Sequence, residues 1–174
     1  GWGWSRNEHV SYLNGEAANS DMLAVSIPTG EQECDQRTFQ HHRAEHTTSD
    51  LLFKNVLYDK SKSVFGGLIL VDEGAHHTDA YQTCRNLILS DTAEAHSMPG
   101  LEINADQVRC SHGATTGQIG EEEVFYLMAR GIPGPDARRL IALGFALDVL
   151  EKISDQRIQS EAATALEAKF ADLF

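Results

Sequence analysis

Short β-prone segments recur along the first two thirds of this chain, and no helical pattern lies between them. The segments are Leu51–Tyr58, Ser63–Val71, Arg85–Leu89, Leu101–Ile103 and Val108–Thr116. Polar residues and glycine separate them at intervals of roughly ten to twenty residues, as in an all-β fold. A βαβ arrangement needs a helical crossover between parallel strands, so it is excluded. A sandwich, a barrel or a β-solenoid remains.

Three features favour a solenoid among these folds. No hairpin dipeptide joins neighbouring apolar segments, and the one Asn-Gly pair, Asn14-Gly15, lies outside them. Val64–Val71 is apolar at odd and even positions, which is typical of a parallel strand buried on both faces. The spacing of the segments suits one wall and one corner of a coil, although no strict repeat motif is visible. We therefore expect a parallel β-solenoid.

The pattern becomes helical toward the C-terminus. Glu121–Glu123 place acids in the first turn of a helix, where the helix dipole favours them. Pro135 suits the first position of a second helix, and Asp155 can cap a third. We expect residues 1–118 to form the solenoid and residues 119–174 to form a small helical domain.

Charge and cysteine usage narrow the class of protein. The 174 residues include 14 Lys and Arg against 26 Asp and Glu, a formal net charge of −12. This balance argues against nonspecific binding to nucleic acid or to anionic membranes. No apolar run approaches the roughly 20 residues that span a bilayer. The three cysteines form no CxxC and are a poor disulfide framework, which favours a reducing compartment. The first residue is Gly rather than Met, so we expect a piece of a longer protein or a processed form.

Cys110 and His112 are the strongest candidates for chemistry. Residues two apart on a strand point to the same face, so the thiol and the imidazole would lie side by side. This ligand pair suits iron, zinc or an iron–sulfur precursor. The alternative is structural, because Val108 has the same parity and would draw Cys110 into the core. Two ligands are too few for a closed site, so a metal would need a second chain.

The other candidate residues have simpler explanations. His41, His42 and His46 lack the His-Glu-x-x-His spacing, and local hydrogen bonding explains them better than a metal. His76 and His77 are weaker candidates still. The chain contains neither a GxSxG nucleophile elbow nor a phosphate-binding P-loop, and its carboxylates are scattered. We therefore do not expect an enzyme, and we reject the alternative that the chain is a β-helix hydrolase.

Several motifs in one order make the chain resemble the SufB/SufD family of iron–sulfur cluster assembly proteins, and SufD more than SufB. They are Arg85–Ala93, Pro99–Ile103, Cys110–Ile119 and Val124–Ile132, with Asp35–Ile69 and Gly74–Gln82 upstream. The resemblance covers roughly residues 30 to 152, and several motifs in register are far more specific than one. It implies a right-handed parallel β-helix followed by a C-terminal helical domain.

The resemblance also implies a scaffold role. A SufD-like chain pairs with a SufB-like subunit through the β-helix and docks a SufC-like ABC-type ATPase through its C-terminal helices. Cys110 and His112 would bind iron or a transient iron–sulfur cluster at the subunit interface, with none held stably by the isolated chain. The residues that match the docking helix are Phe125, Tyr126, Arg130 and Gly131.

Some implications stay open. A SufB-like scaffold and a stand-alone metal-binding β-helix protein are the alternatives. Cys84 stands where the family usually has Asn, and is either a buried small residue or an extra ligand. We expect a location in the cytoplasm or an organelle stroma, and no nucleic-acid or membrane partner. Isolated, the chain is expected to pair with itself through its exposed coils.

Overall fold

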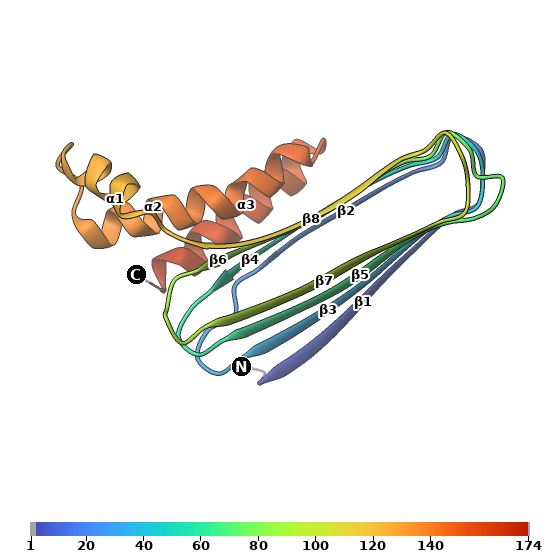
Figure 1. Cartoon of the computed structure of the whole chain (residues 1–174). Helices are drawn as coiled ribbons and strands as arrows, with labels where there is room; N and C mark the ends of the chain where they lie inside the picture. The colour runs from blue at the N-terminus through green and yellow to red at the C-terminus, as the bar shows by residue number, and fades with distance from the viewer. Residues whose placement is uncertain (1–2, 174) are drawn as a thin grey trace.

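The structure, a computed structural model, describes residues 3–173. Within this range eight strands precede the helices (Figure 1). The strands are β1 (Trp4–Leu13), β2 (Asn19–Ser26), β3 (Glu33–His42), β4 (Thr48–Leu57), β5 (Lys62–Val71), β6 (Asp79–Ile88), β7 (Glu94–Ile103) and β8 (Arg109–Gln118). The helices are α1 (Glu121–Met128), α2 (Gly134–Leu147), the 3-10 helix η1 (Asp148–Lys152) and α3 (Gln156–Ala171). None of these described helices is long and apolar enough to cross a membrane.

Successive strands belong to two different sheets, ordered β1-β3-β5-β7 and β2-β4-β6-β8. Every pairing among the described strands is parallel. In the odd-numbered sheet Trp4 pairs with Glu33 and Lys62 with Glu94, so one coil of two strands takes 29 to 32 residues. The chain thus winds through four coils, and the predicted parallel β-solenoid is confirmed.

The corners of the coils repeat one backbone conformation, although the residue types at these positions differ. Between the odd and the even strand of each coil, one non-glycine residue adopts the left-handed conformation: Ala17, His46, His77 and Gln107, all with φ of 58–59°. This conformation is uncommon outside glycine and produces a sharp turn. The sequence shows no repeat motif because the backbone conformation recurs and the side chain does not.

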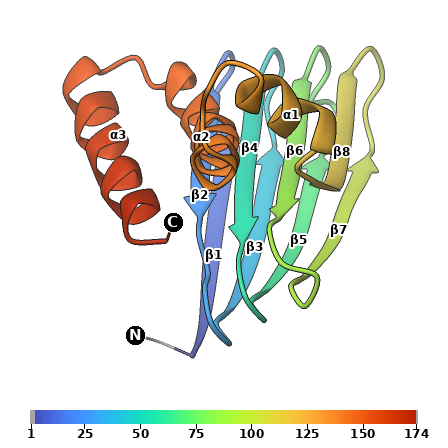
Figure 2. The same ribbon diagram turned by 90° about the vertical axis from the view of Figure 1, so that its left-hand side faces the viewer.

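Side chains alternate between the interior and the outer faces of the solenoid. A central apolar cluster contains Leu51, Phe53, Phe65 and Cys84. In β5 alternate residues are buried and the others partly exposed. The expectation that Val64–Val71 is buried on both faces was therefore wrong, because the helices cover the even-numbered sheet and leave the outer face of the odd-numbered sheet open (Figure 2).

Much of the interior is polar, and hydrogen bonds join successive coils there. Asn55 Nδ2 donates to Asn86 Oδ1 at 2.8 Å, and Asn86 Nδ2 donates to Thr116 Oγ1 at 3.2 Å. These three residues belong to β4, β6 and β8, so the contacts form a ladder along the solenoid axis. Each bond pairs an amide nitrogen that would be costly to bury alone.

The helices pack on the outer face of the even-numbered sheet, where a buried lysine joins them to β4 (Figures 1 and 2). Lys54 is 2% exposed, and its Nζ donates to the Phe145 carbonyl at 2.9 Å and to Asp148 Oδ2 at 2.5 Å. Hydrogen bonds to a charged group contribute about 1.5–3 kcal/mol each. Asp155 caps α3 as predicted, accepting from the backbone N–H groups of Arg157 and Ile158.

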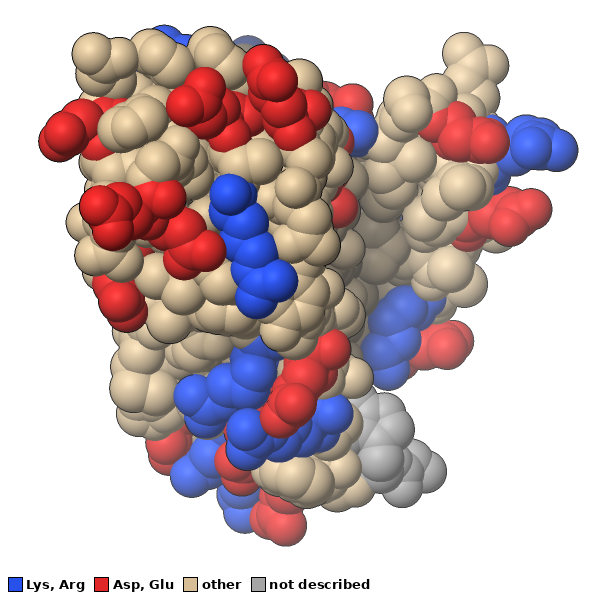
Figure 3. Space-filling view, turned by 90° about the vertical axis from the view of Figure 1, so that its right-hand side faces the viewer, with Lys and Arg blue, Asp and Glu red and all other residues tan. Residues whose placement is uncertain are grey.

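The end of the molecule that contains the corners from odd- to even-numbered strands faces the viewer in Figure 3. Acidic side chains gather over its upper part, and the basic side chains below are interspersed with acidic ones (Figure 3). This face therefore presents no continuous basic surface of the kind that attracts a polyanion.

Buried His42 makes stability depend on pH. Its Nδ1 contacts Thr47 Oγ1 at 2.8 Å and its Nε2 contacts Ser49 Oγ at 2.9 Å. Burial, aided by the neighbouring His41, lowers the pKa of His42 from 6.5 to about 4. Below pH 6.5, His42 therefore takes up a proton in the unfolded chain but stays neutral in the folded chain. The free energy of unfolding falls with pH until the pH reaches the folded-state pKa.

We predict that lowering the pH from 7.5 to 5 costs about 2 kcal/mol of unfolding free energy through His42 alone. In the His42→Gln variant this share of the loss should vanish, as urea unfolding at both pH values would show. The same substitution at exposed His96 is the control and should keep the wild-type loss. Equal pH dependence of the His42 variant and the wild type would contradict the prediction.

Candidate functional site

Cys110 and His112 lie on β8, the last strand of the even-numbered sheet. Cys110 pairs with Ala80 and His112 with Gln82 on β6, and both of these partners are fully buried inside the solenoid. Because in-register residues of parallel strands share a face, both candidate side chains belong to the interior face. Cys110 is half-buried and His112 is exposed, since no further described strand covers β8.

The opposite wall at this end is apolar. Leu101 and Ile103 on β7 are in register with Ile69 and Val71, which are fully buried in the interior. Leu101 and Ile103 themselves remain 36% and 37% exposed. The end of the solenoid formed by β7 and β8 (Figure 2) is here called the open end. It combines a thiol and an imidazole on one wall with apolar side chains on the other. Such a surface favours burial against another protein.

The Cys110 side chain packs against a small cluster that contains Ile69, Val71 and Ala80. Burial raises the pKa of the Cys110 thiol, a hydrogen bond with the Ala80 backbone opposes this, and the Asp79 carboxylate adds to the rise. Cys110 is therefore a neutral thiol at neutral pH. A metal would have to displace its proton, because the thiolate is the ligand.

The open end does not contain a complete metal site. Among the described residues, no group of three or more His, Cys, Asp or Glu could hold a metal ion. A soft thiolate and an imidazole suit iron or zinc. A tetrahedral metal would leave two positions for ligands from outside the chain.

The other histidines are engaged in local contacts. His41 Nε2 lies 2.7 Å from Asp72 Oδ1, and His42 is enclosed by hydroxyl groups. His46 stacks on His77 across two corners, with ring centroids 4.7 Å apart. These contacts agree with the interpretation that the histidines satisfy local hydrogen bonds and packing.

Cys84 lies deeper in the interior than the candidate pair. It is in register with Ala114, and its Sγ lies 3.7 Å from Ser97 Oγ and 3.8 Å from Asn86 Oδ1. Burial raises the pKa of Cys84 to about 11, and these two hydrogen bonds offset only part of the effect. A thiol of this kind is a poor ligand at neutral pH.

A second surface lies on α1. Phe125 is 72% exposed, and Tyr126 and Met128 are exposed beside it, whereas Val124 anchors the helix in the core. The Arg130 guanidinium lies 3.5 Å from the centroid of the Tyr126 ring. Gly131, with φ of 87°, follows in the left-handed conformation that suits a residue just after a helix. An exposed apolar helix face with a stacked arginine has the composition of a protein interface.

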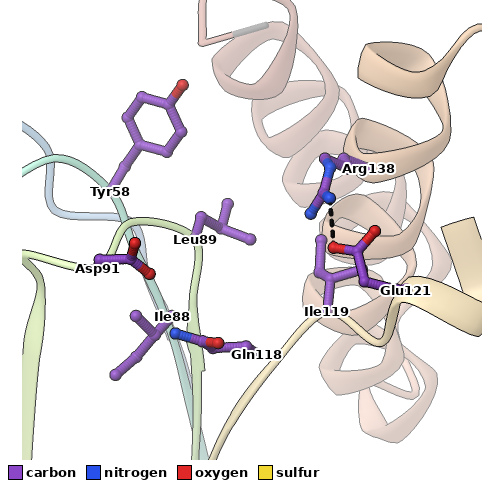
Figure 4. A pocket seen from close by; sticks show the side chains of 8 residues that line it. All are labelled: Tyr58, Ile88, Leu89, Asp91, Gln118, Ile119, Glu121 and Arg138. Carbon is purple, nitrogen blue, oxygen red and sulfur yellow. Dashed lines mark hydrogen bonds and ion pairs between the residues drawn. The ribbon is translucent and has the colours of Figure 1, made fainter.

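Sequence reasoning missed a cavity of about 320 Å³ where the solenoid meets the helices (Figure 4). Arg138 Nη2 donates to Glu121 Oε1 at 2.6 Å at one side of it. The residues that line it are Tyr58, Ile88, Leu89, Asp91, Gln118, Ile119, Glu121 and Arg138. They come from four separate parts of the chain, so no local pattern could reveal the cavity.

The fold and the site define a class of protein. It is a parallel β-solenoid whose open end offers two of the ligands that a metal needs, and an exposed helix lies on its side. The family model for the SUF system FeS cluster assembly SufBD core domain matches residues 1–145. The chain therefore belongs to the SufB/SufD family, as the sequence motifs predicted.

Relatives of known name agree with this assignment. The chain is 38% identical over 156 residues to the iron–sulfur cluster assembly protein SufD of Escherichia coli, covering 90% of this chain and 37% of that protein. It is 39% identical over 138 residues to a SufBD family protein of Synechocystis, covering 79% and 30%. SufD of Bacillus subtilis is 29% identical over 163 residues, covering 94% and 37%. The chain thus spans about a third of the length of these relatives.

The three thiols differ in accessibility, which makes a prediction. Cys34 and Cys84 are buried, and Cys110 is half-buried at the open end. In the native chain we predict that a thiol reagent such as DTNB modifies Cys110 alone, and faster as the pH rises because the thiolate reacts. Mass spectrometry of the labelled protein would locate the adduct, and Cys110→Ser is the control. Equally fast labelling of Cys34 or Cys84 would contradict the structure.

Proposed function

We propose that the chain is a SufD-like, non-catalytic scaffold subunit of an iron–sulfur cluster assembly complex. It pairs through its open end with a SufB-like subunit and docks a SufC-like ABC-type ATPase through α1. The observation that supports this best is the position of Cys110 and His112, together on the interior face of the last described strand. A second subunit can supply the missing ligands there.

The chemistry of the open end suits iron and sulfide as cargo. Cys110 would give a thiolate ligand after losing its proton, and His112 a neutral imidazole. The exposed Leu101 and Ile103 would be buried when a second solenoid end covers them. The backbone groups on the free edge of β8 could pair with a partner strand at the same time. Without that partner, the chain would hold no stable cluster and could pair with itself.

The exposed face of α1 supports a separate docking site. Phe125 and Tyr126 provide apolar area, and Arg130 lies stacked on Tyr126. Aromatic residues and arginine are frequent anchors in protein interfaces. Lys54 holds the helices on the sheet that ends in β8, so one subunit would present both surfaces in fixed relation.

Three free cysteines support a reducing compartment. We therefore place the protein in the cytoplasm or an organelle stroma.

The test is anaerobic reconstitution of the chain with SufB-like and SufC-like partners, followed by counting iron and sulfide. Cys110→Ala/His112→Ala should keep the ternary complex and lose most of the cluster. Phe125→Asp should lose the ATPase and keep the SufB-like subunit. Ser111→Ala, on the same strand, and Val10→Asp, at an exposed apolar position of β1, are the matched controls and should behave as wild type.

Three outcomes would overturn parts of this proposal. Unchanged iron in the double variant would make Cys110 and His112 structural. Tight metal binding by the chain alone would favour a stand-alone metal protein. Failure to bind either partner would remove the scaffold role.

A further inference from the structure

One buried amide directly beneath the open end lacks a hydrogen-bond partner. Gln82 on β6 is 0% exposed, and its Nε2 makes no hydrogen bond with any atom of the described residues. An unpaired buried donor costs about 1–3 kcal/mol. Native proteins rarely retain such a group unless water, an ion or a ligand completes it.

The Gln82 side chain crosses the interior to the opposite sheet. A Cβ atom at Gly67 on β5 would collide with its amide oxygen and would come within 2.7 Å of its Cδ. That amide oxygen lies 3.5 Å from Thr38 Oγ1 on β3, in the coil before Gly67. The missing side chain at Gly67 is therefore what allows the amide to lie across the interior.

Only the last coil lies between this amide and the open end. In that coil His112 is in register with Gln82, and Pro99 is in register with Gly67. Proline has no backbone N–H and a ring without hydrogen-bonding atoms. The last coil thus places His112, a candidate ligand, on one wall above the amide and an inert ring on the other.

The remaining unpaired polar atoms of the interior are amide or hydroxyl oxygens, and none of them is an amide nitrogen. They are the side-chain oxygens of Ser5, Gln36, Gln40, Asn55 and Ser63, on β1, β3, β4 and β5. Among the described residues, Gln82 Nε2 is the one interior amide nitrogen without a partner, and it lies on β6, the strand that pairs with β8. An N–H donor there is suited to an anionic acceptor bound beside Cys110 and His112.

We propose that the side-chain amide of Gln82 donates a hydrogen bond to a sulfur ligand of the metal held at the open end by Cys110 and His112. The assignment rests on the proposed metal-binding role of that pair. Hydrogen bonds to sulfur stabilise the negative charge of thiolate and sulfide ligands. Gln82 binds no metal itself, and it favours sulfur anions as the ligands that complete the site.

The test uses the whole 174-residue chain with Cd²⁺, a soft ion that suits thiolate ligands. Cd²⁺ is added first and in excess, because Cys110 and His112 alone hold it only weakly, and β-mercaptoethanol is then titrated as the external ligand. Its thiol loses a proton to the buffer as the Cd–S bond forms. The absorbance of the sulfur-to-metal charge transfer reports each step.

We expect Gln82→Met to leave Cd²⁺ affinity within about twofold of wild type and to weaken β-mercaptoethanol binding about five- to tenfold, the factor of one ordinary hydrogen bond. Gln40→Met is the control, because Gln40 is an equally buried interior glutamine whose Nε2 donates to Ser49 at 2.8 Å. It should bind the thiol as wild type does.

Stability gives an independent readout. Replacing the amide by a methyl thioether removes the desolvation cost of the unpaired nitrogen, but it also removes the 3.5 Å hydrogen bond that Gln82 Oε1 accepts from Thr38 Oγ1, so Gln82→Met should leave the urea midpoint close to that of the wild type. Gln40→Met should lower it, because the variant loses the hydrogen bond to Ser49. A folded Gln82→Met chain is therefore expected, and weaker thiol binding in it could not be ascribed to unfolding.

The outcomes separate this inference from the proposal beneath it. If Cys110→Ala retains Cd²⁺ affinity, the metal site at the open end is wrong. If Cys110→Ala loses Cd²⁺ and Gln82→Met binds the thiol as tightly as wild type, only the role of Gln82 is wrong and its amide faces internal water. A urea midpoint for Gln82→Met as low as that of Gln40→Met would show that the amide nitrogen is already paired.

Discussion

Parallel stacking of coils determines most of what this molecule can do. Each strand satisfies its backbone through the strands one coil before and one coil after it, in a register of 29 to 32 residues. A structure built in this way leaves unpaired backbone on its last strand unless another element covers it. Here the last described strand is β8, and it contains Cys110 and His112. The candidate site and the unpaired edge therefore have the same cause.

Polar groups inside the solenoid serve two purposes. Most of them join coils, as in the ladder from Asn55 to Asn86 and Thr116. His42 is held by two hydroxyl groups, and burial keeps it neutral. Gln82 differs, because its amide nitrogen has no partner among the described residues. The nitrogens of the interior amides Gln36, Gln40, Asn55 and Asn86 all donate hydrogen bonds, which makes the exception beneath His112 informative.

Sequence reasoning predicted the parts of the fold that local patterns encode. The β-solenoid followed from recurring β-prone segments without hairpin turns, and the cap at Asp155 and the proline in the first turn at Pro135 indicated the helices. It overlooked β1, β2 and β3, because their interior residues include serine, glutamine and histidine and give no apolar alternation.

The pairing of Cys110 with His112 could be predicted, because residues two apart on any strand point to the same face of the sheet. Its position at an open end could not, because that depends on which strand comes last in the sheet. Gln82 gave no signal at all. A glutamine reads as a surface residue, and only the collision that a side chain at Gly67 would cause shows where its amide lies. The cavity of Figure 4 likewise depends on residues as far apart as Tyr58 and Arg138.

Hydrogen exchange of the chain with and without a SufB-like subunit tests the central claim most directly. If the open end is the interface, amides in β7 and β8 should become protected in the complex, and those in β1 and β2 should not change. Protection confined to β1, β2 or the helices, with β7 and β8 exchanging as in the free chain, would contradict the account.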